Sequence, residues 1–214
     1  MLKGRPPALL SRVLPNMTWN FYGHHHKVYL TFDDGPAPDV THRVLEMLSA
    51  YGAKATFFCL GRNVDKYPDL YHRILAEGHT AGNHTYSHLK GFRSSIRNYL
   101  EDIELAAGLI NSKLFRPPYG RILPGQIRAV QSRYRIIMWD VLSHDYNNRL
   151  PGKRVVKNVI SNVKPGSIIV FHDSGKARNN LLVALPEVLG FLKDNRYEME
   201  AIPYNGAVDY RTEI

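Results

Sequence analysis

The 214-residue chain contains a single cysteine and has no apolar run that approaches the roughly 20 residues of a membrane span. One cysteine excludes an intramolecular disulfide, and Cys59 lies in the apolar run ATFFCL, which predicts a buried thiol. The basic first 17 residues are interrupted by proline and arginine and lack the apolar stretch of a signal peptide. We therefore expect no export by that route and, by default, a cytoplasmic location.

Acidic residues are also scarce, because 19 Asp and Glu face 28 Lys and Arg, for a net charge of +9. This balance suits an anionic partner such as nucleic acid, an acidic glycan or a membrane surface. Basic residues cluster only at 153–157 and 176–178, and neither cluster has the interleaved aromatic residues of a strand-binding groove. We therefore expect no nucleic-acid partner. The net positive charge can also be explained without any anionic partner, by basic residues spread over the surface.

Residues 27–36, KVYLTFDDGP, are the most informative stretch of the chain. A short apolar run ends in two adjacent carboxylates, Asp33 and Asp34, followed by Gly35 and Pro36. The residues before the acids favour a strand, and Gly-Pro stops it. A helix cap or a turn would explain one such acid. A pair of acids where a buried strand ends requires a compensating cation or proton.

The rest of the chain alternates between strand-like and helix-like patterns without a linker or a break in composition. This alternation predicts one parallel α/β domain over residues 27–214, preceded by an arm, residues 1–26, whose Trp19, Phe21 and Tyr22 pack on it. Asp39 is expected to cap the first helix. The expected strands cover 28–32, 55–60, 79–84, 114–115, 136–139, 167–171 and 197–202, and the expected helices cover 40–51, 68–77, 94–111, 124–133, 152–163 and 180–193.

The position of the polar residues favours a barrel over an open sheet. A barrel gathers the C-terminal ends of its strands onto one rim, where its active site lies, whereas an open sheet gathers only some of them. Polar residues follow the expected strands at Asp33-Asp34, His84, Arg116, Asp140 and His172.

The segment NHTYSH supplies two histidines, His84 and His88, four residues apart. The same spacing places two imidazoles on one face of zinc-binding helices, but here a tight turn after a strand is expected. Two histidines and one aspartate make a three-ligand site with open positions, which is typical of a catalytic metal. The three adjacent histidines at 24–26 cannot all face one ion, so we expect them in a solvated turn.

Two further segments bring candidate groups to strand ends. RPPYG places Arg116 before two prolines that fix the backbone, so that a peptide N–H can be held rigidly. An ordinary proline turn would explain the prolines but not a cation where acids converge. IIVFHDS leads a buried strand into His172, a candidate acid–base group, although a histidine there can equally be a satisfied core residue.

These four segments, in this order, resemble the motifs of the NodB-type polysaccharide deacetylases, carbohydrate esterase family 4. The match covers roughly residues 27–202 through TFDDGP, the His-x-x-x-His pair with its preceding asparagine, RPPYG and the late histidine. The resemblance implies a distorted (β/α) barrel with about seven parallel strands. It also implies metal-dependent hydrolysis of an N-acetyl or O-acetyl group on a sugar.

Roles follow from the resemblance position by position. It implies that Asp33 is the catalytic base, oriented by Arg116, and that the backbone N–H of Tyr119 stabilises an oxyanion. It also implies that His172 is the general acid and that Asp145 tunes the arginine and histidine groups. The implied metal ligands are Asp34, His84 and His88. These ligands favour Zn²⁺, although Co²⁺ and other divalent transition ions are acceptable.

The chain departs from the family pattern at Leu142, Tyr146 and Val170, where Asp, Trp and Leu are usual. None of these is an implied ligand or proton carrier, so they bear on the acetyl pocket and the substrate more than on the reaction. The expected substrate is an N-acetylglucosamine-containing glycan of peptidoglycan or chitin type. The alternatives are an O-acetyl esterase on xylan-like glycans and a non-catalytic glycan-binding module. The sequence does not indicate an oligomeric state.

Overall fold

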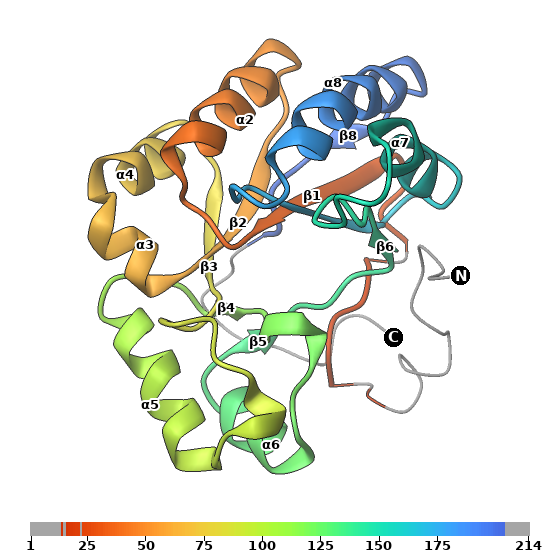
Figure 1. Cartoon of the computed structure of the whole chain (residues 1–214). Coiled ribbons are helices and arrows are strands. Elements are labelled where there is room, and N and C mark those ends of the chain that lie inside the picture. The colour runs from red at the N-terminus through yellow and green to blue at the C-terminus, as the bar shows by residue number, and fades with distance from the viewer. Residues whose placement is uncertain (1–13, 15, 22, 204–214) are drawn as a thin grey trace.

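The computed structural model describes residues 14, 16–21 and 23–203. Strands and helices alternate along this part of the chain, as the sequence predicts (Figure 1). The strands are β1 Lys27–Asp33, β2 Ala55–Cys59, β3 Thr80–Asn83, β4 Leu114–Phe115, β5 Arg135–Ile136, β6 Val141–Leu142, β7 Ile168–His172 and β8 Glu198–Met199. The α-helices are α2 Pro38–Ala50, α3 Gly61–Lys66, α4 Pro68–Ala76, α5 Ile96–Ala107, α6 Pro124–Gln131, α7 Gly152–Ile160 and α8 Arg178–Asp194, and the 3-10 turns are η1 Gly91–Arg93 and η2 Pro118–Gly120.

The strands form one sheet in the order β5-β4-β3-β2-β1-β7-β6, with β8 added beside β1. Every strand pair in it is parallel. The sheet curls, and helices cover its outer side (Figure 1). Between its two ends runs the segment before β1, where Thr18 bridges to Ile137 and Asn20 to Ser167. The predicted distorted (β/α) barrel with about seven parallel strands is therefore confirmed, with seven strands in the main path and β8 added beside β1.

Alternation along β1 sorts its side chains between two environments. Val28, Leu30 and Phe32 point outward into the core beneath the helices, whereas Thr31 and Asp33 point inward to the buried Arg116. Successive side chains of a strand face opposite sides. The apolar half of β1 therefore anchors the strand, and its polar half lines the interior.

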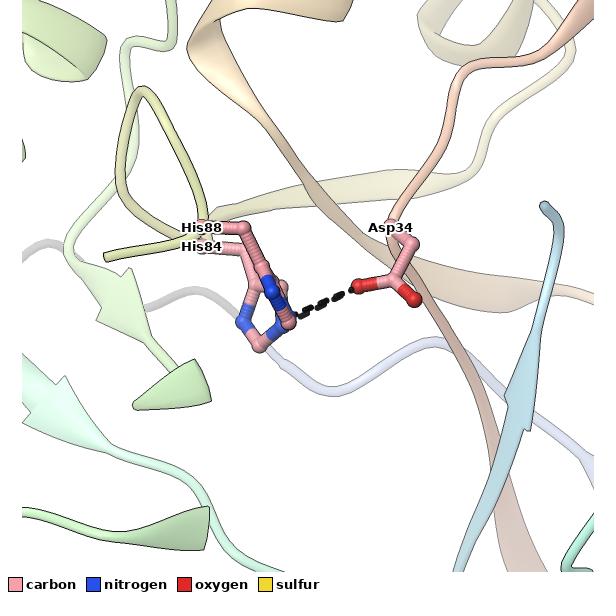
Figure 2. A group of neighbouring side chains, drawn as sticks. All are labelled: Asp34, His84 and His88. Carbon is pink, nitrogen blue, oxygen red and sulfur yellow. Dashed lines mark ion pairs between the residues drawn. The ribbon is translucent and has the colours of Figure 1, made fainter. Parts of the chain in front are cut away.

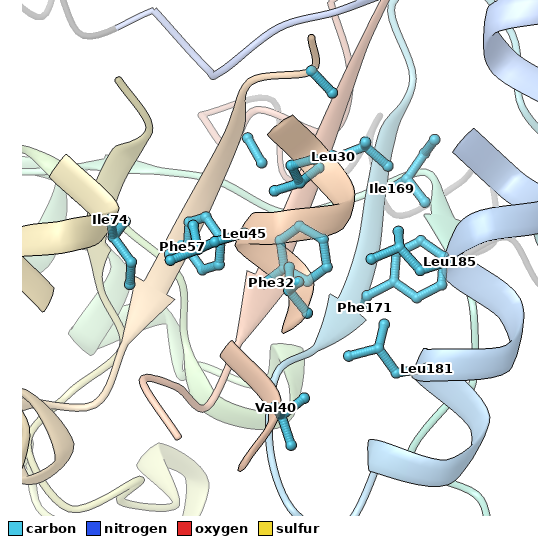
Figure 3. Packing of buried hydrophobic residues seen from close by; sticks show 14 of the residues in the cluster. Leu30, Phe32, Val40, Leu45, Phe57, Ile74, Ile169, Phe171, Leu181 and Leu185 are labelled. Carbon is cyan, nitrogen blue, oxygen red and sulfur yellow. The ribbon is translucent and has the colours of Figure 1, made fainter. Parts of the chain in front are cut away.

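The outer core lies between the central strands and the helices around them. Phe32, Phe57 and Phe171 stack across β1, β2 and β7, with ring centroids 5.0 and 6.0 Å apart. Leu45 of α2 and Leu185 of α8 pack on these strands (Figure 3). Burying an apolar side chain of this size stabilises the fold by about 2 kcal/mol.

The segment before β1 packs on the barrel. Met17, Trp19 and Phe21 are buried, whereas the expected contact of Tyr22 lies outside the described residues. His25 and His26 are exposed, as expected for a solvated turn, whereas His24 is half-buried and its ring stacks on Phe21. Cys59 is buried and free, as predicted. Across the described residues, no helix combines the length and apolar character needed to cross a membrane.

Two local predictions were wrong, and one short helix was missed. Asp39 does not cap α2, because the helix begins at Pro38 and its N-cap is Ala37, without a side-chain hydrogen bond. The six-residue helix α3 was not predicted at all. Asp140 does not join the other polar strand ends, because its carboxylate accepts hydrogen bonds from Ser167 Oγ (2.9 Å) and Ile168 N (2.8 Å) at the start of β7.

Candidate active site

A pocket of about 640 Å³ opens at the C-terminal ends of the central strands. The strand register creates it, because Asp33 at the end of β1 pairs with Phe58 of β2 on one side and with His172 of β7 on the other. Asp33 and His172 both line this pocket. The neighbouring strands β1 and β7 thus place the carboxylate of Asp33 and the imidazole of His172 side by side at the bottom of the pocket.

Asp33 is held by the fully buried Arg116, which enters the barrel interior from the loop after β4. Arg116 Nη1 donates to Asp33 Oδ1 and to Thr31 Oγ1, each at 2.7 Å. The other guanidinium nitrogens donate to the backbone carbonyls of Ile137 (3.1 Å) and Met138 (2.9 Å). A planar guanidinium bonded on three sides has little freedom, so it fixes the orientation of the Asp33 carboxylate.

Asp34, His84 and His88 meet beside Asp33 and offer three ligand atoms within 4.8 Å of one another. Figure 2 shows both imidazoles facing the carboxylate of Asp34. Asp34 Oδ1 lies 3.1 Å from His88 Nε2 and 3.6 Å from His84 Nε2. Burial raises the pKa of Asp34, but the neighbouring imidazoles outweigh burial and hold this pKa well below its usual range.

The orientation of His84 favours a cation at this place. His84 Nδ1 lies 2.7 Å from the backbone oxygen of Arg116, and a carbonyl oxygen only accepts, so Nδ1 carries a proton. Nε2, which faces Asp34, is therefore the ring nitrogen that has a lone pair for a metal ion when the ring is neutral. The buried Asp34 Oδ1 accepts no hydrogen bond from the described residues. An orphaned carboxylate oxygen facing imidazole nitrogens is suited to a divalent cation, and this donor set fits zinc.

The loop that carries both histidines is held by hydrogen bonds to the side chains of Asp102 and Asn83. Asp102 of α5 accepts hydrogen bonds from the backbone N–H groups of Tyr86 and Ser87 and from the Ser87 hydroxyl. Asn83 Oδ1 accepts from Thr85 N at 2.8 Å, which tightens the turn. The histidines therefore sit on a tight turn, as predicted, and not on a long helix. An acid in the middle of a helix gives no sequence signal for this role.

His172 is paired with Asp145 on the other side of the pocket. His172 Nδ1 lies 2.8 Å from Asp145 Oδ1, and the backbone N–H of His172 donates to Asp145 Oδ2 at 2.7 Å. Burial by itself lowers the pKa of His172, but the charges of Asp145, Asp34 and Asp33 raise it to about 9. The guanidinium hydrogen bonds of Arg116 go to Asp33, Thr31 and two backbone carbonyls, so none of them involves Asp145.

Tyr119 lies on the wall of the pocket beside His88, with their rings 4.6 Å apart. Its backbone has a positive φ of 62°, and Asp34 and His88 also have positive φ. Such conformations are rare outside glycine and cost about 1–3 kcal/mol each. The same wall contains Gly120, where a Cβ would lie 2.4 Å from the ring of Trp139. Backbone strain and close side-chain packing thus both occur at the pocket.

Leu142, Tyr146 and Val170, where the chain departs from the family pattern, all line this pocket. Tyr146 packs edge-on against His172, with ring centroids 5.0 Å apart.

Asp173 is a buried acid for which sequence reasoning gave no role. Its Oδ2 accepts a hydrogen bond of 2.6 Å from the Thr41 hydroxyl, and its Oδ1 has no partner among the described residues. Gly35 lies directly against this carboxyl group, because a Cβ there would be 2.0 Å from Oδ2. Burial raises the pKa of Asp173 to about 8, with help from the charges of Asp34 and Asp33. Its position after His172 was visible in the sequence, but its contact with the Asp-Asp-Gly-Pro turn was not.

Comparison with known proteins gives consistent results. The family model "Polysaccharide deacetylase" matches residues 23–136. A peptidoglycan-N-acetylglucosamine deacetylase of Bacillus cereus is 35% identical over 193 residues, which cover 86% of this chain and 70% of that protein. A chitooligosaccharide deacetylase of Sinorhizobium fredii is 32% identical, over 83% of this chain and 91% of that protein.

A solved structure has the same fold. The crystal structure of the Bc1960 peptidoglycan N-acetylglucosamine deacetylase superposes with a TM-score of 0.82 at 32% identity, and the match covers 90% of this chain and 94% of that chain. The chain therefore belongs to the polysaccharide deacetylase family, and it is a hydrolase acting on carbon–nitrogen bonds other than peptide bonds.

Proposed function

We propose that this protein removes N-acetyl groups from N-acetylglucosamine units of a peptidoglycan-like or chitin-like glycan, with Asp33 as base and His172 as acid. The observation that carries the proposal is the placement of these two groups on neighbouring strands of one pocket, with the Asp34, His84 and His88 cluster beside them. The named relatives act on glycans of both kinds.

Asp34, His84 and His88 would hold a divalent metal ion, for which zinc fits the donor set best. Such an ion supplies Lewis acidity, lowering the pKa of water and polarising a carbonyl group. The neighbouring Asp33 carboxylate, fixed by Arg116, receives the proton of the attacking water. A general base in such a position contributes typically 10²–10⁴-fold to the rate.

Collapse of the tetrahedral intermediate requires a proton on the departing nitrogen. His172 holds that proton at neutral pH, because its pKa is raised to about 9 by the neighbouring acids, chiefly Asp145, against the effect of burial. The backbone N–H of Tyr119 is the proposed oxyanion donor, since the turn in which it lies is fixed by two prolines. Base and acid then serve opposite ends of the scissile bond.

An O-acetyl esterase would use the same groups, because only the leaving group differs. An alkoxide leaving group depends less on protonation by His172 than an amine does. Comparing acetate release from an N-acetylglucosamine oligomer with release from acetylated xylan separates the two activities. A non-catalytic glycan-binding protein is disfavoured, since the base, the acid and all three proposed ligands are present together.

The direct test is acetate release from N-acetylglucosamine oligomers by metal-loaded protein, alongside the Asp33→Asn variant. We expect acetate from the wild type and a loss of at least 10²-fold in the variant, with equal metal content in both. Turnover of the variant near the wild-type rate would remove Asp33 as the base. Absence of acetate from the loaded wild type would mean that the substrate class is wrong.

A further inference from the structure

Three basic side chains, Lys90, Arg121 and Lys176, stand at the pocket that contains the catalytic groups. All three line it, and all three are exposed. They come from separate segments: Lys90 precedes η1, Arg121 follows η2, and Lys176 lies in the loop after β7. The basic groups therefore come from different parts of the barrel rim rather than from one run of charge.

Each of these cations lies over an aromatic ring of the same pocket. Lys90 Nζ is 5.4 Å from the ring centroid of Tyr119, and Lys176 Nζ is 5.5 Å from that of Tyr146. The guanidinium of Arg121 is 5.2 Å from the ring centroid of Phe92. A cation that lies over the face of an aromatic ring is attracted to the electron-rich face of that ring. They hold the charges at the pocket instead of leaving them free in solvent.

The rings place the charges on both sides of the catalytic groups. Tyr119, beneath Lys90, also packs against His88, with the ring centroids 4.6 Å apart. Tyr146, beneath Lys176, packs against His172, with the ring centroids 5.0 Å apart. A glycan chain lying across the pocket, with its acetyl group at the catalytic floor, would have a cation on each side.

None of the three cations has an ion-pair partner among the described residues. The acids that line the pocket are Asp33 and Asp34. Asp33 is paired with Arg116, and Asp34 faces the two histidines. Among the residues that the structure describes, no acid thus balances the positive charge at the rim.

A sugar unit of N-acetylglucosamine carries no charge, so it gives these cations nothing to bind. We propose that Lys90, Arg121 and Lys176 form an anion-binding rim, and that the natural glycan carries carboxylate groups on the sugars next to the one that loses its acetyl group. Separate single cations on both sides suit single carboxylates repeated along a chain. This inference rests on the proposed function and narrows its substrate class.

The test uses one glycan in two charge states. Oligosaccharides in which N-acetylglucosamine alternates with a sugar bearing a carboxylate are compared with the same oligosaccharides after the carboxylates are converted to neutral amides. At low ionic strength we expect the wild type to prefer the carboxylate form by about ten-fold in kcat/KM, which corresponds to about 1.4 kcal/mol. Salt should reduce the preference, because exposed charges are screened.

Matched variants assign the preference to the rim. The triple variant Lys90→Gln, Arg121→Gln, Lys176→Gln should bring the ratio of the two kcat/KM values close to one. The control Lys153→Gln removes an exposed charge from α7, away from the pocket, and should keep the wild-type ratio. A wild-type ratio near one, or equal loss of the ratio in both variants, would overturn the inference.

Binding separates this inference from the proposed function. The affinity of the Asp33→Asn variant for the carboxylate and amide forms is measured by calorimetry, without turnover. Tighter binding of the carboxylate form with no acetate release from the wild type would refute the proposed deacetylation and keep the anion-binding rim. Equal affinity for both forms, together with normal acetate release, would refute the rim and keep the deacetylation.

Discussion

Replacing Asp145 by asparagine should move the alkaline limit of activity to lower pH. In the wild type, His172 has a pKa of about 9, since the charge and hydrogen bond of Asp145, with the charges of Asp34 and Asp33, overcome the effect of burial. A general acid works only while it is protonated, so activity is present below this pKa and is lost as the pH rises through it. Removing the Asp145 charge lowers the pKa of His172.

The geometry sets the magnitude. Asp145 accepts two hydrogen bonds, from Nδ1 and from the backbone N–H of His172, whereas an amide offers a single acceptor oxygen. Loss of an adjacent opposite charge shifts a pKa by about 1–3 units. We therefore expect the alkaline limb of kcat/KM to move down by about two pH units, and the rate at pH 8 to fall by at least ten-fold.

The assay is acetate release measured from pH 5 to pH 10 on wild-type and variant proteins with equal metal content. A bound cation lowers the pKa of a nearby imidazolium in both proteins, so the difference between the two profiles reports Asp145. A second variant, Asp140→Asn, removes an acid that lies outside the pocket and should leave the alkaline limb in place. An unchanged alkaline limb in Asp145→Asn would refute the assignment of His172 as the acid.

Further predictions concern the metal cluster, the buried acid and the pocket wall. His84→Ala should bind metal much more weakly, because one of three ligands is lost, and metal content after dialysis checks this; an unchanged content would remove His84 from the cluster. Asp173 has a pKa raised to about 8, so its contribution to stability is present at low pH and is lost as the pH rises toward 8. Asp173→Asn should therefore flatten the fall of Tm between about pH 4 and pH 8, the unfolded and folded pKa values of this carboxyl group, and parallel Tm curves would contradict the burial argument. Gly120→Ala should raise KM, because the new Cβ would lie 2.4 Å from the Trp139 ring and would displace this wall of the pocket. An unchanged KM would contradict the importance of this close contact for substrate binding.

Much of the fold follows from patterns that depend on neighbours along the chain. Alternation along β1 and the helical stripe of α2 are local, and both elements lie within three residues of the predicted limits. The parallel barrel follows from the regular alternation of strands with helices. By contrast α3 is six residues long and has one buried apolar side chain, Val64, so it has no stripe that periodicity could detect.

The candidate site divides in the same way. Asp33, Asp34, His84 and His88 stand at strand ends, and their convergence follows once the strands are parallel. The prediction for Asp140 was wrong because β5 ends at Ile136, earlier than expected. The chain then crosses to the start of β7, so Asp140 contacts that end of β7 and not the pocket. A short strand ends where its pairing partner ends, and that partner is distant in sequence. The limits of such a strand therefore cannot be predicted from its own residues.

The supporting contacts could not be predicted for a related reason. Asp102 contacts the turn that carries the two histidines from the middle of α5. In the sequence, an acid at such a position looks like an ordinary surface residue. Lys90 and Lys176 are single cations in loops 86 residues apart, and only the barrel places both at one pocket. Contacts of this kind depend on the packing of distant elements, which no local pattern records.

We propose that a cation held by Asp34, His84 and His88 works with Asp33 and His172 in N-deacetylation. The test is acetate release from N-acetylglucosamine oligomers after treatment with a chelator, and again after addition of zinc or cobalt, with bound metal determined in the same samples. We expect activity to disappear with the metal and to return with about one ion per chain. Full activity in metal-free protein, or one bound ion per chain without any acetate release, would contradict it.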